Sequence, residues 1–244
     1  MTVRKYLNQE LRLGDIPELE AVYSAMEACY KRITGSNDVK MQYNIGSREL
    51  EVVYRDDSGE WMRIPINQLS DGYKSTISLV ADIAYRMAVL NPQLLGNVCR
   101  ETDGIVLIDE IDLHLHPTWQ QRILADLRYI FPKVQFIVST HAPAVVSTAK
   151  SENVIILDNG EVYEPSGEVH GKDTNTIISG IMGASERPVE IKALFNEFYH
   201  FIDEENADAA EKVLTDLKHK IGDDDPEISS CNVKLKLLKI RSKK

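Results

Sequence analysis

The chain has 244 residues, of which 43% are hydrophobic, enough for one large domain or two small ones with a buried core. Its formal net charge of −10 excludes a uniformly basic nucleic-acid-binding surface, because phosphate contacts need clustered Lys and Arg. The three cysteines lie far apart without a C-x-x-C pair, which excludes a disulfide framework and a cysteine-rich zinc site.

The first part of the chain predicts one helix followed by a small antiparallel sheet. The predicted elements are an amphipathic helix over 17–34 and strands over 39–45, 48–54 and 61–66. A turn at Gly46-Ser47 joins the first two strands, and the turn Asp56-Asp57-Ser58-Gly59 precedes the third. We assign residues 1–68 to this segment.

From residue 74 helices and strands alternate. The predicted elements are a helix over 74–90, a strand over 105–108, a helix over 117–129, a strand over 134–138, a helix after 143 and a strand over 154–157. The strands are continuously apolar, as in strands covered on both faces, and the βαβαβ order indicates a parallel sheet. Beyond residue 173 only helical spacing recurs, which predicts a helical subdomain over 173–244. The fold class is therefore α/β.

No apolar run reaches the length of about 18 residues that a membrane span needs. The first residues, Met1 to Lys5, also lack the apolar stretch of a secretory signal. We therefore expect a cytoplasmic protein without a membrane partner. The basic residues from Lys234 to Lys244 leave a local nucleic-acid contact open, although a solvated tail is the simpler interpretation.

Two adjacent carboxylates carry the strongest chemical signal. Asp109 and Glu110 follow the apolar run 105–108, and ligands of open α/β sheets bind beyond the carboxyl ends of the strands. Asp109 is suited to hold Mg²⁺, which takes few protein carboxylates. Glu110 would polarise an attacking water as a general base. Acidic residues also follow strands simply as helix caps, and the pair alone leaves that interpretation open.

Two weaker elements accompany the carboxylates. His141 follows the strand predicted over 134–138, so a shared sheet edge would bring its imidazole near the pair, where it can hydrogen-bond a γ-phosphate oxygen. Leu69-Ser70-Asp71-Gly72 precedes the long helix, where Ser70 can cap the helix and Gly72 allows close approach to an anion site. Taken alone, each element also fits a turn residue or a helix cap.

In this order and spacing, the three elements resemble the C-terminal lobe of ABC-type ATPase heads, the group that contains RecF-like and SMC-like proteins. Residues 69–72 resemble the signature motif, 104–110 the Walker B strand with its catalytic glutamate, and His141 the switch histidine. The segments 107–120 and 136–143 resemble the AAA-type "predicted ATP-binding protein" branch, which includes PtuA-like and retron-associated antiphage ATPases.

The resemblance implies a P-loop NTPase-type lobe over 69–172 that binds ATP and Mg²⁺, dimerises on nucleotide binding, and serves antiphage defence or DNA maintenance. By resemblance, the site residues are Ser70, Asp71 and Gly72 for the nucleotide, Asp109 for Mg²⁺, Glu110 and His141 for catalysis, and Asp112 and His114 for the dimer interface.

No G-x-x-x-x-G-K-[ST] motif occurs in the sequence. In the family the P-loop lies upstream of the signature motif, so we expect a member without its N-terminal lobe, through a shortened chain, a split gene or a decayed copy. The P-loop amides and lysine supply most of the grip on the β- and γ-phosphates. We therefore expect poor ATP binding by the chain alone, and a P-loop-bearing partner or a homodimer for ATP hydrolysis.

Two other functions stay open. A metal-dependent hydrolase or nuclease would use Asp109, Asp112, His114, His116 and His141, because alternate residues of an extended D-x-H-x-H segment face one way. A non-catalytic scaffold would use the helical tail to recruit an effector such as a nuclease.

Overall fold

The computed structural model describes residues 17–56 and 58–241. The chain divides into two compact units, the first ending at Ile177 and the second beginning at Ile178. The predictions for Met1 to Lys5, for Asp57 and for the last lysines fall outside the described residues. No helix within the described ranges is long and apolar enough to span a membrane.

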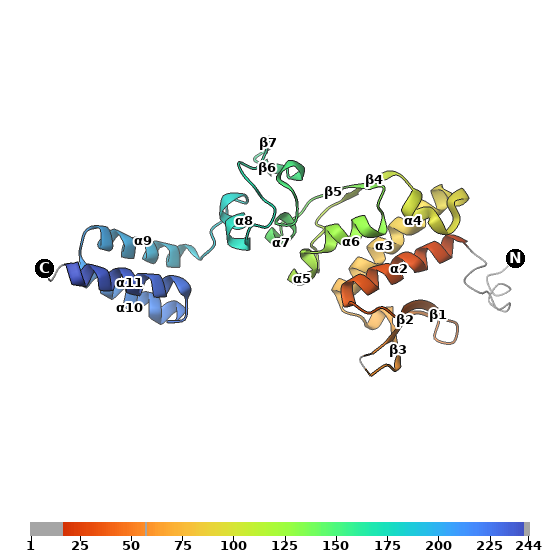
Figure 1. Cartoon of the computed structure of the whole chain (residues 1–244), viewed down its shortest axis with the longest axis horizontal. Coiled ribbons are helices and arrows are strands. Elements are labelled where there is room, and N and C mark those ends of the chain that lie inside the picture. Colours follow the sequence, from red (N-terminus) through yellow and green to blue (C-terminus); the bar gives the residue numbers. More distant parts are fainter. Residues whose placement is uncertain (1–16, 57, 242–244) are drawn as a thin grey trace. The chain divides into compact units, whose positions relative to one another are not determined.

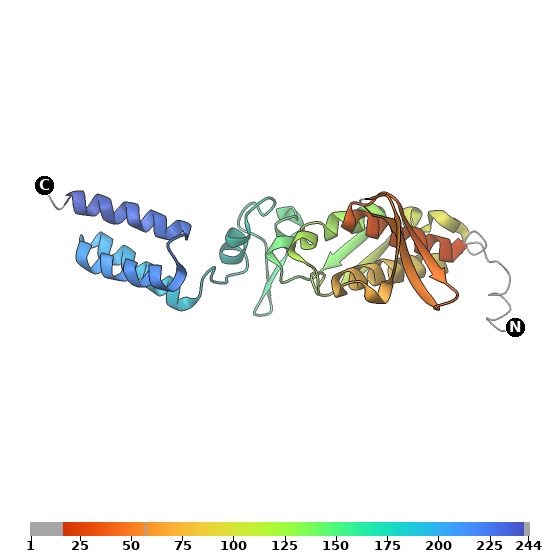
Figure 2. The ribbon, with the colours of Figure 1, turned by 90° about the horizontal axis from the view of Figure 1, so that it is seen from below.

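Two long helices and an antiparallel sheet begin the first unit (Figures 1 and 2). These elements are α2 (Pro17–Thr34), β1 (Val39–Asn44), β2 (Glu49–Arg55), β3 (Trp61–Pro65), a 3-10 turn (Ile66–Gln68) and α3 (Asp71–Leu90). The sheet has the order β1-β2-β3, and Met41 lies opposite Val52. Both side chains are buried in the core that α2 and α3 also line. The predicted helix and antiparallel sheet are thus confirmed.

Helix α3 begins at Asp71, three residues before the predicted start. Ser70 is extended, and the amide of Lys74 donates to its carbonyl oxygen at 3.1 Å, which closes the first helical turn. Ser70 therefore occupies the N-cap position, but its side chain makes no capping hydrogen bond, contrary to the prediction. Asp71 and Gly72 lie inside the first turn of the helix.

Strands β4 (Gly104–Ile108) and β5 (Val134–Val138) form a parallel pair with Ile108 opposite Val138. The predicted helix over 117–129 is wrong as one element, because α5 (Pro117–Gln120) and α6 (Ile123–Ile130) are separate. They part at Arg122, whose backbone is not helical and whose guanidinium donates to the carbonyl of Arg32 on α2 at 2.7 Å.

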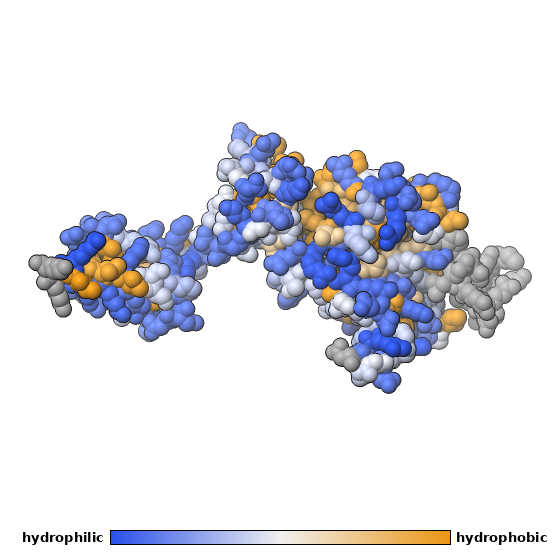
Figure 3. Space-filling view, viewed as in Figure 1, coloured by the Kyte–Doolittle hydropathy of each residue, from blue (hydrophilic) through white to orange (hydrophobic). Residues whose placement is uncertain are grey.

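The parallel pair is covered on one face only. Side chains alternate along a strand, and Val106 and Phe136 pack against the core. The other face carries Ile105, Leu107 and Ile137, which are 61%, 76% and 52% exposed. Figure 3 shows apolar residues at the surface over β4 and β5. The prediction that these strands are buried on both faces is therefore wrong for the described chain.

The predicted third parallel strand is also wrong. β6 (Ile156–Asp158) pairs with β7 (Glu161–Tyr163) in an antiparallel hairpin instead. Asn159 and Gly160 both have positive φ, 49° and 83°, as a tight hairpin turn requires, so the chain reverses at once. The remaining elements of this region are 3-10 turns over Pro92–Asn97 and Ser151–Asn153, α4 (Val98–Glu101), α7 (Pro143–Val146) and α8 (Thr174–Gly180).

The second unit is helical, as predicted. Its three long helices are α9 (Val189–Asp203), α10 (Ala207–Ile221) and α11 (Pro226–Arg241). Residues at helical spacing form its core, which includes Phe195, Phe198, Leu214, Leu217 and Ile228. The chain thus combines a parallel strand pair with covering helices, a small antiparallel sheet and a helical C-terminal part, the α/β class expected.

Candidate functional site

Ser139 joins the carboxyl ends of the two parallel strands. Its amide donates to the carbonyl of Ile108 at 2.9 Å, which continues the β4–β5 ladder by one residue. Its hydroxyl donates to Asp109 Oδ1 and accepts the amide hydrogen of Glu110 at 2.9 Å. The shared sheet edge therefore forms as predicted. No role for Ser139 was predicted, because a role for its hydroxyl depends on the strand register.

Glu110 has a left-handed backbone with φ of 51°. This conformation costs a residue with a Cβ atom about 1–2 kcal/mol. The hydrogen bond to Ser139 holds the Glu110 amide, and the amide of Leu113 donates to the Glu110 carbonyl at 3.0 Å in the next turn. Within the described residues, the Glu110 carboxylate has no hydrogen bond or ion pair, and the residue is exposed. The carboxylate is thus open to water at the strand ends.

Asp112 fixes the loop that carries His141. Its Oδ1 accepts hydrogen bonds from the Thr140 hydroxyl and, at 3.3 Å, from the amide of His141. Thr140 in turn accepts the amide hydrogen of Ala142 at 3.0 Å. The half-buried Asp112 side chain therefore has an intramolecular role that the sequence did not suggest. Its place in a dimer interface stays a prediction.

The signature residues belong to a second cluster. A Cβ atom added to the buried Gly72 would lie 2.8 Å from the carbonyl oxygen of His114 and 2.8 Å from Cζ3 of Trp119. The rings of Tyr73 and Trp119 meet edge to face at 4.5 Å. Gly72 thus permits close packing of α3 against the segment that follows β4, whereas the sequence predicts that Gly72 allows a ligand to approach.

The exposed Asp71 pairs with Lys74 at 2.8 Å. The hydrogen bond from Lys74, then its charge and a weaker contribution from His114, hold the pKa of Asp71 below its ordinary value. Among the described residues, no hydrogen bond or ion pair joins Ser70, Asp71 or Gly72 to Asp109, Glu110 or His141. Residues 70–72 and the carboxylates therefore form two clusters without a polar bond between them in the described ranges.

The D-x-H-x-H segment is not extended, contrary to the prediction. His114 has a φ of 63°, and His116 turns to the start of α5, where its Nδ1 lies 3.1 Å from the Thr118 hydroxyl. Over residues 17–56 and 58–241, no group of three or more His, Cys, Asp or Glu side chains is arranged to hold a metal. A lone Asp109 still fits Mg²⁺, which is bound by one or two carboxylates with water and phosphate oxygens.

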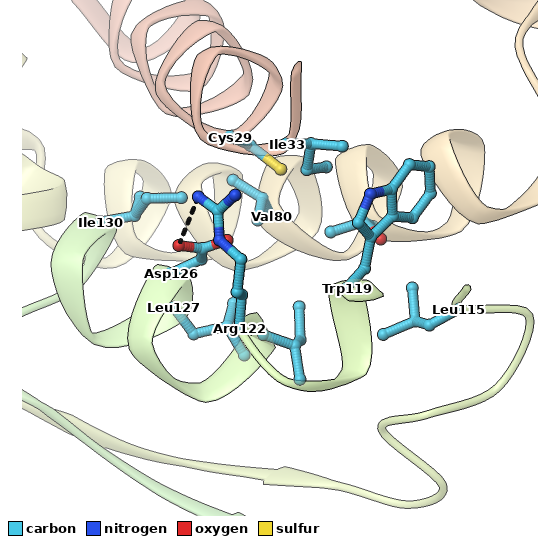
Figure 4. A pocket seen from close by; sticks show the side chains of 11 residues that line it. Cys29, Ile33, Val80, Leu115, Trp119, Arg122, Asp126, Leu127 and Ile130 are labelled. Carbon is cyan, nitrogen blue, oxygen red and sulfur yellow. Dashed lines mark ion pairs between the residues drawn. The ribbon is translucent and has the colours of Figure 1, made fainter. Parts of the chain in front are cut away.

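One small cavity of the first unit is too small for a nucleotide. It lies among α2, α3, α5 and α6, and its volume of about 10 Å³ has room for one water. Cys29, Trp119 and Asp126 line it, with Arg122 Nη2 lying 3.9 Å from Asp126 Oδ1 (Figure 4). Asp126 also pairs closely with Arg32 of α2. This ion pair between helices is structural.

Known proteins match most of the chain. Residues 31–147 match the family "AAA domain, putative AbiEii toxin, Type IV TA system". The retron Ec83 probable ATPase of Escherichia coli is 32% identical over 237 residues, which cover 96% of this chain and 41% of that protein. The retron Vc95 probable ATPase of Vibrio cholerae is 43% identical over 143 residues, or 55% of this chain and 27% of that protein.

The Septu protein PtuA of Bacillus thuringiensis is 32% identical over 177 residues, or 67% of this chain and 43% of that protein. A solved structure from work on ATP-driven dimerization and DNA-stimulated activation of SMC ATPases overlaps 60% of this chain and 84% of its own, with 19% identity and a TM-score of 0.40. The chain spans less than half the length of these three curated relatives. The chain is therefore similar to ABC/AAA-like ATPases: to the AAA domain family over residues 31–147, and to the two retron probable ATPases and PtuA over 143 to 237 residues.

Proposed function

We propose that this chain forms the Mg²⁺-binding and water-activating part of an ATP site whose P-loop lies on another polypeptide segment. The cluster of Asp109, Glu110 and Ser139 at the carboxyl ends of β4 and β5 carries the proposal. Open α/β sheets bind their ligands at this edge. The cluster combines an anchored carboxylate with one open to water, as metal-assisted phosphoryl transfer requires.

Each residue has a distinct role in the proposed reaction. Asp109, oriented by the Ser139 hydroxyl, would hold Mg²⁺, which when bound neutralises charge on the phosphates. Glu110 would accept a proton from the attacking water. His141, whose loop Asp112 fixes, would donate a hydrogen bond to a γ-phosphate oxygen. Ser139 and Asp112 are positioning residues in this scheme.

The uncovered face of the parallel pair supports a P-loop supplied from elsewhere. Parallel sheets are almost always covered on both faces, because their crossover connections place helices there. Ile105, Leu107 and Ile137 instead face solvent. A P-loop unit is itself a strand, a loop and a helix. We infer that such a unit extends this sheet and covers these side chains.

The separation of the two clusters supports a nucleotide-driven dimer. The signature residues Ser70, Asp71 and Gly72 lie at the start of a helix of 20 residues, where free amides favour an anion. Because no hydrogen bond or ion pair joins them to Asp109 among the described residues, they are suited to close on a nucleotide held by a second head, of the same or another chain. We place this activity in antiphage defence because the chain is similar to a retron probable ATPase and to PtuA, and the sequence resembles the antiphage ATPases of those two kinds.

The test is ATP turnover by this chain mixed with, or fused to, a P-loop-bearing polypeptide. We expect the chain to raise turnover and Glu110→Gln to abolish the increase while ATP binding is kept. Glu101→Gln is the matched control, because Glu101 lies before the opposite end of β4, where it pairs with Lys133 at 2.8 Å. Turnover that the chain leaves unchanged refutes the proposal. Biological activity that survives Glu110→Gln favours the scaffold function instead.

A further inference from the structure

Helix α11 is apolar on two opposite sides. One side is buried in the second unit and carries Ile228, Cys231, Leu235 and Leu238. The other carries Val233, Leu237 and Ile240, which are 58%, 56% and 61% exposed. Residues three and four apart share a helix face, so these three form one row, here called the α11 stripe. Figure 3 shows apolar residues gathered near the C-terminal end of this unit.

The fold of the second unit does not use the α11 stripe. A helix in a small bundle needs one apolar face, and the outer faces of α9 and α10 are polar. Among the described residues of this unit, the one other exposed large hydrophobic side chain is Val189, at the start of α9. Single exposed apolar residues are ordinary on protein surfaces, whereas aligned ones mark interaction sites.

Cations border the stripe on both sides. Lys236 is three residues after Val233 and four before Ile240, and Arg241 is four after Leu237. In the part of the chain that the structure describes, neither cation forms an ion pair. Lys239 differs, because it pairs with Glu211 at 2.7 Å. The α11 stripe thus presents an apolar centre between two cations available to a partner.

We propose that the α11 stripe binds an amphipathic helix of another polypeptide, with apolar residues facing the stripe and acidic residues beside them. The stripe covers seven residues of rise, about 10 Å, which matches two turns of a partner helix. We infer acidic residues on the partner because they would form ion pairs with Lys236 and Arg241. This inference does not rest on the proposed ATP site.

The charges disfavour the other two occupants. Residues 229–241 contain no Asp or Glu. If two copies of the stripe packed together, parallel or antiparallel, basic residues would therefore face basic residues and repel each other. An anionic membrane surface would attract the stripe, but it would repel a chain of net charge −10. A helix with acidic flanks has neither conflict.

The experiment measures binding of two fluorescent peptides to the full chain by anisotropy. Both peptides are designed helices with leucines at positions i, i+3, i+4 and i+7. One has glutamates beside the leucines, and the other has lysines at the same positions. We expect the glutamate peptide to bind at least tenfold more tightly. Leu237→Lys should weaken its binding at least tenfold, and the double variant K236E/R241E should reverse the preference. Val189→Ser is the matched control and should change nothing.

Four results would overturn the proposal. Equal binding of both peptides would mean an apolar surface without charge recognition, and binding that Leu237→Lys leaves intact would place the peptide elsewhere. Self-association in sedimentation that Leu237→Lys abolishes would make the occupant a second copy. Binding to phosphatidylserine vesicles that Leu237→Lys abolishes would make it a membrane. Circular dichroism of each variant checks that α11 stays folded.

Discussion

Gly72→Ala tests the contact between helix α3 and the segment that follows β4. The new methyl group would lie 2.8 Å from a backbone oxygen of His114 and 2.8 Å from the Trp119 ring, well inside a contact distance of about 3.5–4.0 Å. Such overpacking costs about 1–3 kcal/mol. Alanine regains at most about 1 kcal/mol of helix propensity. We therefore expect the free energy of unfolding to fall by about 1–2 kcal/mol.

The assay is urea unfolding followed by tryptophan fluorescence, with Trp61→Phe in every protein so that Trp119 is the one remaining tryptophan. Trp119 then reports on the first unit alone. Gly104→Ala is the matched control, because no atom lies within 4 Å of its added Cβ, and it should change stability by less than about 0.5 kcal/mol. If Gly72→Ala is as stable as Gly104→Ala, the close packing described here is wrong.

Three further predictions concern groups outside the candidate site. Arg32→Met should lower the free energy of unfolding by about 3 kcal/mol in urea, because it leaves the buried Asp126 carboxylate without its main partner. The hydrogen bond from Arg187 holds the pKa of Asp225 below its usual value. The pair therefore stabilises the folded state fully above about pH 4, the pKa of an unfolded Asp. This stabilisation is lost as the pH falls through the lower pKa of the folded state. Below about pH 4, the free energy of unfolding in urea should therefore change less steeply with pH in Arg187→Met than in the unmodified chain. An unchanged steepness contradicts this prediction. Burial raises the pKa of Cys29 to about 12, so a disulfide reagent at pH 8 should label it only after unfolding, as mass spectrometry can check.

The strand-end cluster was predictable because it depends on chain order. Apolar runs identified both strands, and the polar residues that follow parallel strands must share one edge. The placement of Asp109 and Glu110 at this edge follows from the rule, whereas the nearness of the His141 imidazole to them stays a prediction. The roles of Ser139 and Asp112 could not be predicted in this way, because their hydrogen bonds depend on the strand register and on the left-handed turn at Glu110.

The third strand shows where an apolar pattern is insufficient. Residues 154–157 fit a buried parallel strand and an exposed hairpin equally well, because periodicity does not report the neighbouring strand. The deciding signal was the pair Asn159-Gly160, which closes a two-residue hairpin turn. The prediction that β4 and β5 are buried on both faces failed for a similar reason, as the exposed Leu107 shows. An apolar run indicates that a strand needs to be covered, but it does not say which polypeptide covers it.

The two clusters of the candidate site are held as one piece although no hydrogen bond or ion pair joins them in the described ranges. The segment between them is fixed at both ends, by the hydrogen bond from the Ile111 amide to the Ser139 carbonyl at 3.0 Å and by the packing of Gly72 on His114. Ile111 and Leu115 are buried in the core at the two ends of this segment. Under the proposed function, the signature residues and the carboxylates would serve two different nucleotides. Movement of α3 would then reach the carboxylates through this short segment, because a packed core transmits displacement rather than absorbing it.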